Sequence, residues 1–380
     1  MKWSIPIGRV LGIPIRMHIS FVALLAWIAW LGWKVSGLSS SLWALALINC
    51  LFACVILHEL GHSLVAVRFG SEVRSVTLLP IGGVASIKSL PEKPYQELLM
   101  ALAGPTVNLA IMAVLSVVRG GFPSWVGATT FPTNTGELLD ALIRANLVMA
   151  AFNLVPAFPM DGGRVLRSFL ALFLTYPRAT AVAATMGQLL ALGFILVGLV
   201  TNPFLVIIGI FVFLSAETEE RSVHVKDLLR DVLAEDAMVT DFVSLQPDDT
   251  LGRCLENVYH RKQEDFPVEQ DGRLVGVLSR KDWLAALHRD GSQALIRDVM
   301  RRRFVCVSPK TPLLRLYQDL AAFKQGVLPV VDGGKILGLL TVEDVSRYLM
   351  VQEANQRRGR AAAPGASGSR APSRLTIDLG

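Results

Sequence analysis

Charged residues are scarce in the first half of this sequence, and that scarcity limits the classes to which it can belong. Residues 1–216 contain 13 Lys or Arg and 7 Asp or Glu, a net charge of +6, whereas residues 217–380 contain 24 of each sign. The formal charge of +6 for the whole chain therefore belongs to its apolar part. A hydrophobic content of 52% excludes a disordered chain, and the dispersed basic residues exclude nucleic acid as a partner.

Cysteine is scarce as well, and so is any sign of a removable leader. The four cysteines in 380 residues exclude a disulfide framework of the kind that stabilises small secreted domains. No small-residue cleavage pattern follows the first apolar run, Met17–Trp33, so we expect this run to be retained as a membrane span.

Long apolar segments take the place of the missing charges. A membrane-spanning helix needs roughly 20 consecutive apolar residues. Segments of about this length predict six spans, the last two separated by Thr201-Asn202-Pro203, which is typical of a turn. The segments are Met17–Trp33, Val35–Leu57, Leu98–Val118, residues 138–160, and two within Ala179–Ala216.

The basic residues predict how these spans are oriented. Six spans place both termini on one side, and most Lys and Arg residues of the short loops fall on that side, which marks it as cytoplasmic. They are Lys2, Arg9, Arg16, Arg68, Arg74, Lys88, Lys93, Arg164, Arg167 and Arg178, against Lys34, Arg119 and Arg144 opposite. We therefore predict a multi-pass protein of the cell membrane, embedded in the lipid bilayer, with both termini in the cytoplasm.

A β-hairpin is predicted between the second and third spans, over Val73–Ile87. β-Branched residues surround Pro80 and the pair Gly82-Gly83, which favours two strands over a helix. An unpaired strand edge cannot face lipid, so we expect the hairpin to be covered or to line a wet cavity.

The second part of the chain contains an internal repeat, at residues 237–283 and 299–345. Matching residues recur at a constant offset of 62, and each copy is predicted to run strand, helix, strand, strand, helix, with turns at Asp271-Gly272 and Asp332-Gly333. This pattern resembles a tandem of cystathionine-beta-synthase (CBS) domains. The matching pairs are Met238/Met300, Pro247/Pro309, Leu251/Leu313, Pro267/Pro329, Gly276/Gly338 and Asp282/Asp344.

The resemblance to CBS pairs implies an adenine nucleotide such as ATP or AMP as a regulatory ligand, and dimerisation through the CBS domains. The family's ribose-contacting position falls on Asp344, beside Thr341, and the first copy offers Ser279 and Asp282. The alternative is that Asp282 and Asp344 only cap helices. Residues 301–303, all arginine, are interpreted as a solvated basic turn, with contacts to nucleotide phosphates or to lipid headgroups as the alternatives.

Together these patterns predict a mostly α polytopic membrane domain with a membrane-associated β-hairpin, followed by an α/β tandem CBS domain. The last residues, rich in Arg, Ala, Gly, Pro and Ser, are expected to be disordered. The predicted boundaries are 1–216 for the membrane domain, 217–225 for a linker, 226–350 for the CBS pair (copies 226–287 and 288–350), and 351–380 for the disordered tail.

A metal-binding motif ends the second span. His58, Glu59 and His62 form H-E-x-x-H, in which a helix places both imidazoles on one face, so that they can bind one zinc ion. The carboxylate of Glu59 is then in reach of an activated water molecule as general base. Cys54, one helical turn earlier, is interpreted as a packing residue or as a thiol ligand.

A catalytic zinc usually takes a third protein ligand. Asp161 is the candidate, because it is the lone carboxylate where Pro156, Pro159 and Gly162-Gly163 break an apolar segment. Asp161 as a mere helix N-cap is the alternative for that residue. The other possible ligands, in polar connecting sequence, are Glu72, Glu92 and Glu97.

H-E-x-x-H together with N-x-x-P-x-x-P-x-D-G, from Asn153 to Gly162, resembles the site-2 protease family of intramembrane zinc metalloproteases. A branch of that family carries a C-terminal CBS pair. The resemblance covers residues 1–350 and implies that His58, His62 and Asp161 bind Zn²⁺, that Glu59 activates water and that Asn153 helps to stabilise the oxyanion. It further implies helix packing and site support by Gly104, Pro105 and Asn108, and pairing of the Gly82-Gly83 hairpin with an unwound substrate strand.

The predicted function is therefore an intramembrane zinc endopeptidase that cleaves a transmembrane protein, with the CBS pair as a nucleotide-dependent gate. The substrate is expected to be an anti-sigma factor, a pro-sigma factor or a signal-peptide remnant. Two alternatives are a CBS-gated transporter, with the histidines as a transit site for zinc, and a non-catalytic scaffold that senses nucleotides. Glu59 discriminates between these functions, since a transit site needs no general base.

Overall fold

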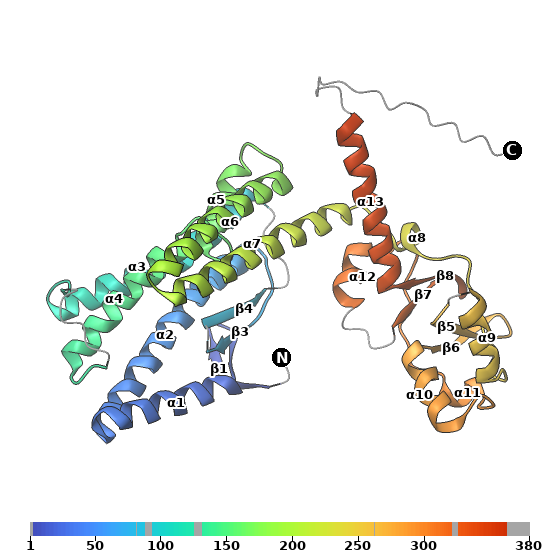
Figure 1. The fold of residues 1–380 in the computed structure, drawn as a ribbon, viewed down its shortest axis with the longest axis horizontal. Helices are drawn as coiled ribbons and strands as arrows, with labels where there is room; N and C mark the ends of the chain where they lie inside the picture. The colour runs from blue at the N-terminus through green and yellow to red at the C-terminus, as the bar shows by residue number, and fades with distance from the viewer. Residues whose placement is uncertain are drawn as a thin grey trace. The chain divides into compact units, whose positions relative to one another are not determined.

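The computed structural model describes residues 3–80, 82–87, 93–124, 131–261, 263–320 and 326–362. The chain divides into two compact units, Met1–Val223 and His224–Gly380. Helices dominate the first unit, whereas the second unit repeats a motif of strands and helices (Figure 1). The predicted fold class, a mostly α membrane domain followed by an α/β tandem CBS domain, is confirmed.

Seven helices of the described chain begin in the first unit. Among the described residues, α1, α2, α3 and α6 are long and apolar enough to cross a membrane. The other two predicted spans correspond to α4 and α7, so a total of six stays a prediction. The helices are α1 (Ile19–Ser36), α2 (Leu38–Arg68), α3 (Pro94–Arg119), α4 (Thr135–Asn153), α5 (Asp161–Leu170), α6 (Tyr176–Val200) and α7 (Pro203–Leu228).

A four-stranded sheet of order β1-β2-β3-β4 completes the first unit. The predicted hairpin is present as β3 (Val73–Leu79) and β4 (Gly82–Ile87), and β4 is an outer strand of this sheet. A second hairpin, of β1 (Ser4–Val10) and β2 (Ile13–His18), was not predicted from the sequence; it turns at Leu11 and Gly12 with positive φ angles. Apolar side chains of β2, β3 and α2 form a common core, so the sheet lies against the helix that carries H-E-x-x-H.

Small residues let the helices of the first unit approach one another closely. Helix α3 packs against α2, α4 and α5. A Cβ atom at Gly61 of α2 would lie 3.0 Å from the backbone oxygen of Ala103 on α3, and Gly209 brings α7 against Ala191 of α6. Such close backbone contacts are typical of helices packed within membranes.

The second unit contains two copies of one motif, as the repeat predicted. The hairpins turn at Asp271-Gly272, as predicted, and at Gly333-Gly334, one residue later than the predicted Asp332-Gly333. The predicted first strand of each copy is reduced to one parallel bridge, Leu245 to Val268 and Val307 to Val330. The elements are α8 (Ala234–Ala237), α9 (Leu251–Arg261), β5 (Phe266–Gln270), β6 (Arg273–Leu278), α10 (Arg280–Asp290), α11 (Ile296–Val299), α12 (Leu313–Leu320), β7 (Val327–Asp332), β8 (Lys335–Thr341) and α13 (Val342–Ala362).

Two boundaries differ from the prediction. Helix α7 runs without a break through residues 217–225, so the segment predicted as a linker is helical. Helix α13 continues through residues 351–362, which we predicted to be disordered. This stretch is rich in Gln, Glu, Ala and Arg, which favour a helix once the preceding turn is formed. Residues 363–380 lie outside the described residues.

Candidate metal centre

Helix α2 brings the two motif histidines together. His58 and His62 are one turn apart on the same face, and only 5% and 9% of their surfaces are exposed. Their Nε2 atoms are 3.1 Å apart, with the rings at a steep angle to each other. Both nitrogens therefore point to one small volume.

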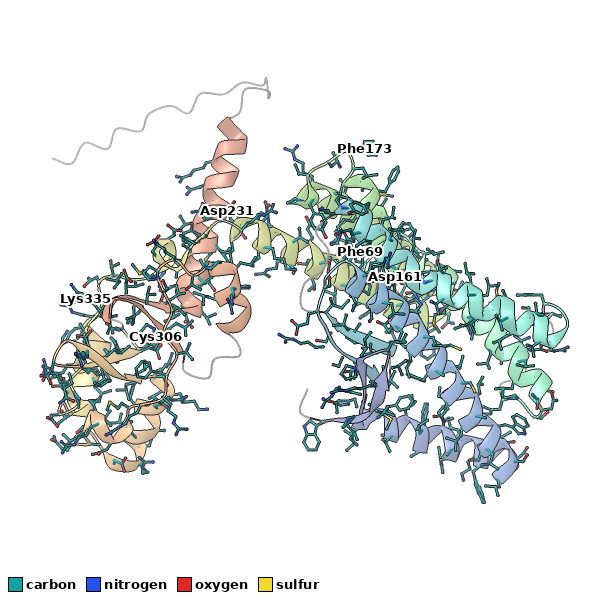
Figure 2. All side chains as sticks on the ribbon, turned by 180° about the vertical axis from the view of Figure 1, so that it is seen from behind. Phe69, Asp161, Phe173, Asp231, Cys306 and Lys335 are labelled. Carbon is teal, nitrogen blue, oxygen red and sulfur yellow. The ribbon has the colours of Figure 1, made fainter. Side chains whose placement is uncertain are left out.

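Asp161 reaches the same volume from a different part of the chain. Helix α4 ends at Asn153, a proline-containing loop follows, and Asp161 is the first residue of α5. A Cβ at Gly162 would overlap the backbone oxygen of Val155, and one at Gly163 would lie 2.7 Å from Ala157, so glycine is what permits this tight return. Figure 2 labels Asp161 among the helices of the first unit.

The three side chains have the geometry and chemistry of a zinc site. Oδ2 of Asp161 lies 3.3 Å from Nε2 of His58 and 3.2 Å from Nε2 of His62. Two donors on a tetrahedral zinc ion are separated by about 3.3 Å, given Zn–N distances of about 2.0–2.1 Å. No hydrogen-bond partner satisfies Asp161 Oδ2 within the described chain, and no other cluster there brings three metal-binding side chains together. Two imidazoles and one carboxylate fit zinc and leave a fourth position open.

One backbone hydrogen bond fixes the orientation of His62. Its Nδ1 lies 2.7 Å from the backbone oxygen of Met100 on α3. Since a carbonyl oxygen only accepts, Nδ1 carries the proton and Nε2 keeps its lone pair for the metal.

Helix α3 supports the site through the residues that the family resemblance singled out. A Cβ at Gly104 would lie 2.6 Å from Cε1 of His58 and even closer to Nε2 of His62. Pro105 and Asn108 are buried on the same helix, and the side-chain amide of Asn108 has no partner among the described residues. Only glycine at position 104 lets α3 lie directly against both imidazoles.

The strand β4 passes over Glu59. A Cβ at Gly83 would lie 2.7 Å from Cγ of Glu59, and Gly82 has a φ of 137°, a conformation that favours glycine. The outer edge of a sheet, the general-base candidate and the histidine pair are therefore neighbours.

The remaining sequence candidates have different surroundings. Glu72 is exposed, and Glu92 lies outside the described residues. Glu97 is fully buried but binds Arg167. Cys54 accepts a hydrogen bond from Nδ2 of Asn146 at 3.4 Å and is outside the three-residue cluster. Asn153 is partly buried at the end of α4, and its role in stabilising the oxyanion stays a prediction.

Two groups near this site were not predicted from the sequence, the side chain of Arg167 and the carbonyl of Met100. Arg167 was counted only as a cytoplasmic loop charge, yet it is fully buried between Glu97 and Glu219. Its position could have indicated this, because Arg167 lies six residues after the predicted ligand Asp161 and next to apolar helices. A charge in such surroundings needs a partner. The Met100 carbonyl could not be found in this way, because every residue has one.

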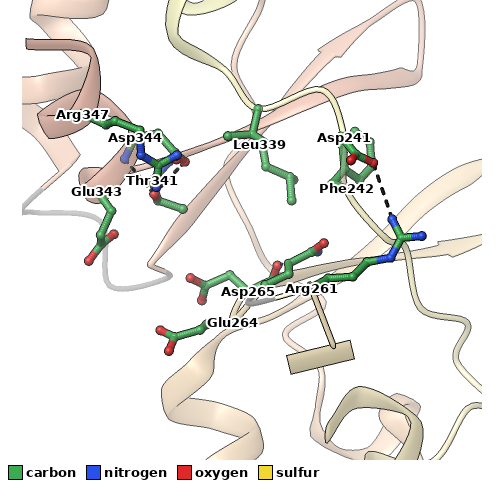
Figure 3. Close-up of a pocket in the computed structure, with 12 residues that line it drawn as sticks. Asp241, Phe242, Arg261, Glu264, Asp265, Leu339, Thr341, Glu343, Asp344 and Arg347 are labelled. Atoms are coloured by element: carbon green, nitrogen blue, oxygen red, sulfur yellow. Dashed lines mark hydrogen bonds and ion pairs between the residues drawn. The ribbon is translucent and has the colours of Figure 1, made fainter. Parts of the chain in front are cut away.

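A pocket of about 640 Å³ lies between the two copies of the CBS motif (Figure 3). Thr341 and Asp344, predicted to bind nucleotide, line it together with Leu339 and Phe242. Hydrogen bonds of 2.7 and 3.0 Å run from the Thr341 hydroxyl and backbone nitrogen to Asp344 Oδ2, so Asp344 also caps α13. Charged residues complete the lining: Asp241, Arg261, Glu264, Asp265, Glu343 and Arg347.

The pocket carries an excess of negative charge, and Asp265 responds to it. Burial raises the pKa of Asp265 above its ordinary value, and the neighbouring carboxylates Glu343 and Glu264 raise it further. Five carboxylates face two arginines here. A ligand with many phosphates is therefore disfavoured unless a cation accompanies it.

The matching position in the first copy is occupied by a side chain of the protein itself. Arg301 donates to both carboxylate oxygens of Asp282 at 2.6 and 2.7 Å, and Ser279 donates to Oδ2 at 2.6 Å. Burial alone would raise the pKa of Asp282, but these bonds hold it below its ordinary value. Arg302 and Arg303 are exposed, as a solvated basic turn predicts, whereas Arg301 is partly buried and paired with Asp282. The repeat offset pairs Arg301 with Val239, which lines the open pocket.

Comparisons with known proteins match both units. Residues 46–135 match the sequence model described as Peptidase family M50, and residues 223–289 and 296–351 match the CBS domain. The zinc metalloprotease MJ0392 of Methanocaldococcus jannaschii is 34% identical over 357 residues, which cover 94% of this chain and 99% of that protein.

Two further similarities cover only part of the chain. Stage IV sporulation protein FB of Bacillus subtilis is 32% identical over 120 residues, 31% of this chain and 38% of that protein. The solved structure of a site-2 protease from Methanocaldococcus jannaschii is 38% identical, with a TM-score of 0.42, and covers 57% of this chain and 95% of that one.

Proposed function

This chain belongs to the site-2 protease family, peptidase family M50, in the branch with a tandem CBS pair, and we propose that it cleaves membrane proteins in or near a transmembrane segment. Membership of the family makes it a zinc metalloprotease. The observation that carries the proposal is the triangle of His58, His62 and Asp161, with sides of 3.1–3.3 Å, beside Glu59 and next to spanning helices.

In this mechanism His58, His62 and Asp161 would hold the zinc ion. When bound, zinc supplies Lewis-acid polarisation and a nucleophile at neutral pH. Glu59 takes the proton from the attacking water and returns it to the leaving amine nitrogen. Asn153 donates a hydrogen bond to the developing oxyanion. The hydrogen bond from His62 to Met100 keeps the ring in the tautomer that the metal needs.

The substrate is proposed to bind as an added strand on β4. A peptide in a helix hides its backbone, so cleavage requires local unwinding to an extended form. The outer edge of β4 offers backbone groups to such a strand, and Gly83 places it directly over Glu59. This arrangement favours a transmembrane protein as the substrate.

The orientation follows from the basic residues of the short loops, which support cytoplasmic termini and a cytoplasmic CBS pair. In that compartment the pocket at Asp344 would meet adenine nucleotides. The charge of its lining favours adenosine or AMP over ATP. Helix α7 passes directly from the first unit into the second, which supports a role of the nucleotide in gating proteolysis.

A comparison of membrane proteomes tests the proposed function. Cells with Glu59→Ala should accumulate full-length precursors that cells with the wild-type chain convert to shorter forms. If no membrane protein changes its length between the two, the proposed protease activity is wrong. A transporter with a zinc transit site, the rival function, would instead keep zinc flux in proteoliposomes with Glu59→Gln.

A further inference from the structure

A buried arginine that the hydrolytic mechanism does not use lies inside the first unit. Arg167, on α5, has no exposed surface. Its guanidinium is always charged, and burying a charge among apolar helices is unfavourable unless it is paired. The partners of Arg167 therefore indicate what the charge is kept for.

Arg167 joins two helices through its hydrogen bonds. On one side, Nε and Nη2 both donate to Oε1 of Glu97 on α3, Nε at 3.0 Å. On the other side, Nη1 donates to Oε1 of Glu219 on α7 at 2.7 Å. The rings of Phe158 and Tyr176 each lie 5.0 Å from the guanidinium carbon, so the group is also held by cation–π contacts.

Arg167 is linked to Asp161 in two ways. Asp161 begins α5, and Arg167 lies on the same helix of ten residues, so the two move as one rigid piece. Phe158, three residues before Asp161, lies against the same guanidinium. The chain on both sides of the metal ligand is therefore fixed by Arg167.

A third contact bears on His62. Glu97 lies three residues before Met100 on α3, and the Met100 carbonyl accepts the hydrogen bond from His62 Nδ1. Arg167 thus connects α5, which begins with Asp161, to α3, whose Met100 carbonyl orients His62.

The fourth contact reaches α7. Glu219 is the exposed member of the group, with 30% of its side chain accessible, while Arg167 and Glu97 are fully enclosed. Loss of the Glu219 bond leaves a neutral buried pair, so the first unit can keep its fold without it. A shift of α7 changes the bond to Arg167 directly.

We propose that Arg167 is a positioning residue that holds Asp161 and His62 in the relative positions that zinc binding needs. Through its bond to Glu219, the geometry of the zinc site also depends on the position of α7. The inference rests on the zinc site of the proposed function. It adds three residues, Glu97, Arg167 and Glu219, that touch neither metal nor substrate.

The test uses the purified full-length chain with Arg167→Lys, which keeps the charge but lacks the fork that binds two carboxylates. Glu219→Gln removes the negative charge from the α7 partner and leaves only a neutral acceptor for Arg167. The matched controls are Arg178→Lys on α6 and Glu217→Gln on α7, both at exposed positions. The readouts are the zinc dissociation constant, the visible spectrum of the Co²⁺-substituted protein, and kcat and KM separately.

Arg167→Lys should weaken zinc binding by about 10-fold or more and shift the Co²⁺ spectrum, because residues that support metal ligands typically have effects of this size. Glu219→Gln should have a smaller effect in the same direction, with kcat lowered and KM unchanged. The double variant should have the same zinc affinity and Co²⁺ spectrum as Arg167→Lys alone, since both changes disturb the same hydrogen-bond network. The two controls should match the wild type.

Two results would overturn the inference. If folded Arg167→Lys and Glu219→Gln keep the wild-type zinc affinity and Co²⁺ spectrum, Arg167 only packs helices. Additive effects in the double variant would show that Glu219 does not act through Arg167. Should Arg167→Lys fail to fold, Glu219→Gln decides alone. A wild-type chain that binds no zinc would refute the proposed function, and with it the inference.

Discussion

His62 donates from Nδ1 to the backbone oxygen of Met100 at 2.7 Å, so a residue on α3 sets the tautomer of a histidine on α2. Helix α3 also presents Gly104 to both imidazoles and Glu97 to Arg167. The metal-binding triangle is therefore a property of three packed helices and one loop.

Asp161→Asn should reduce zinc affinity by more than about 100-fold, since removing a ligand exceeds the effect of removing its support. The neutral amide is a weaker donor to zinc, and two histidines alone hold the ion poorly. Isothermal titration of the metal-free protein with zinc measures the change. Asp140→Asn, which breaks the ion pair with Arg119 on another part of the first unit, is the control and should bind zinc normally. If Asp161→Asn and Asp140→Asn bind zinc with equal affinity, Asp161 is not a zinc ligand.

Gly104→Ala should impair zinc binding even though residue 104 is not a ligand. The added methyl group would collide with His58 and His62, and such overpacking costs about 1–3 kcal/mol. Gly193→Ala on α6 is the matched control, because a Cβ there meets nothing within 4 Å. Thermal unfolding with and without zinc should show a smaller zinc-induced rise in Tm for Gly104→Ala only. The same rise in both variants would contradict the close approach of α3.

The repeat predicts that one residue decides whether each nucleotide site is open. Arg301 pairs with Asp282 in the first copy, while its counterpart Val239 lines the open pocket at Asp344. Titration with AMP should give one site per chain in the wild type, two with Arg301→Val and none with Val239→Arg. Arg302→Val, at an exposed neighbouring position, should keep one site. If the number of AMP molecules bound per chain is the same in all these variants, AMP binds elsewhere.

AMP affinity should rise as the pH falls from neutral toward the raised pKa of Asp265. That pKa lies above the ordinary Asp value of about 3.9, so protonation begins at a higher pH than for a solvated carboxyl group. Each proton bound removes a negative charge that repels phosphate. Asp265→Asn should bind AMP more tightly at neutral pH and lose most of this dependence. The affinity for adenosine, which has no phosphate, should depend little on pH in either protein. If it depends strongly on pH, a group other than Asp265 causes the pH dependence.

Much of this protein could be predicted from sequence because its signals are local. The apolar runs, the hairpin at Gly82-Gly83 and the repeat offset of 62 each arise from the spacing of neighbouring residues, and the structure confirms these elements. His58 and His62 are four residues apart on one helix, so their proximity could be predicted. Asp161 was found because a lone carboxylate in an apolar segment needs an explanation.

What could not be predicted depends on contacts between distant segments. Glu97 and Arg167 are 70 residues apart, so the sequence around Arg167 can signal that it needs a partner but not that the partner is Glu97. Arg301 belongs to the second copy of the repeat but donates to Asp282 of the first copy, 19 residues earlier in the chain. The hairpin of β1 and β2 was missed because its short strands precede an apolar run that dominates the pattern. The helical segment at 217–225 was missed because a charge-rich junction resembles a linker.

The most direct test of the central claim is to compare purified wild-type and Glu59→Gln proteins for zinc content and for cleavage of a transmembrane peptide in liposomes. The account predicts one zinc per chain in both proteins, because Glu59 is not a ligand, and a rate that falls by about 10²–10⁴-fold in Glu59→Gln through loss of the general base. Cleavage by Glu59→Gln at the wild-type rate, with zinc bound, would contradict it.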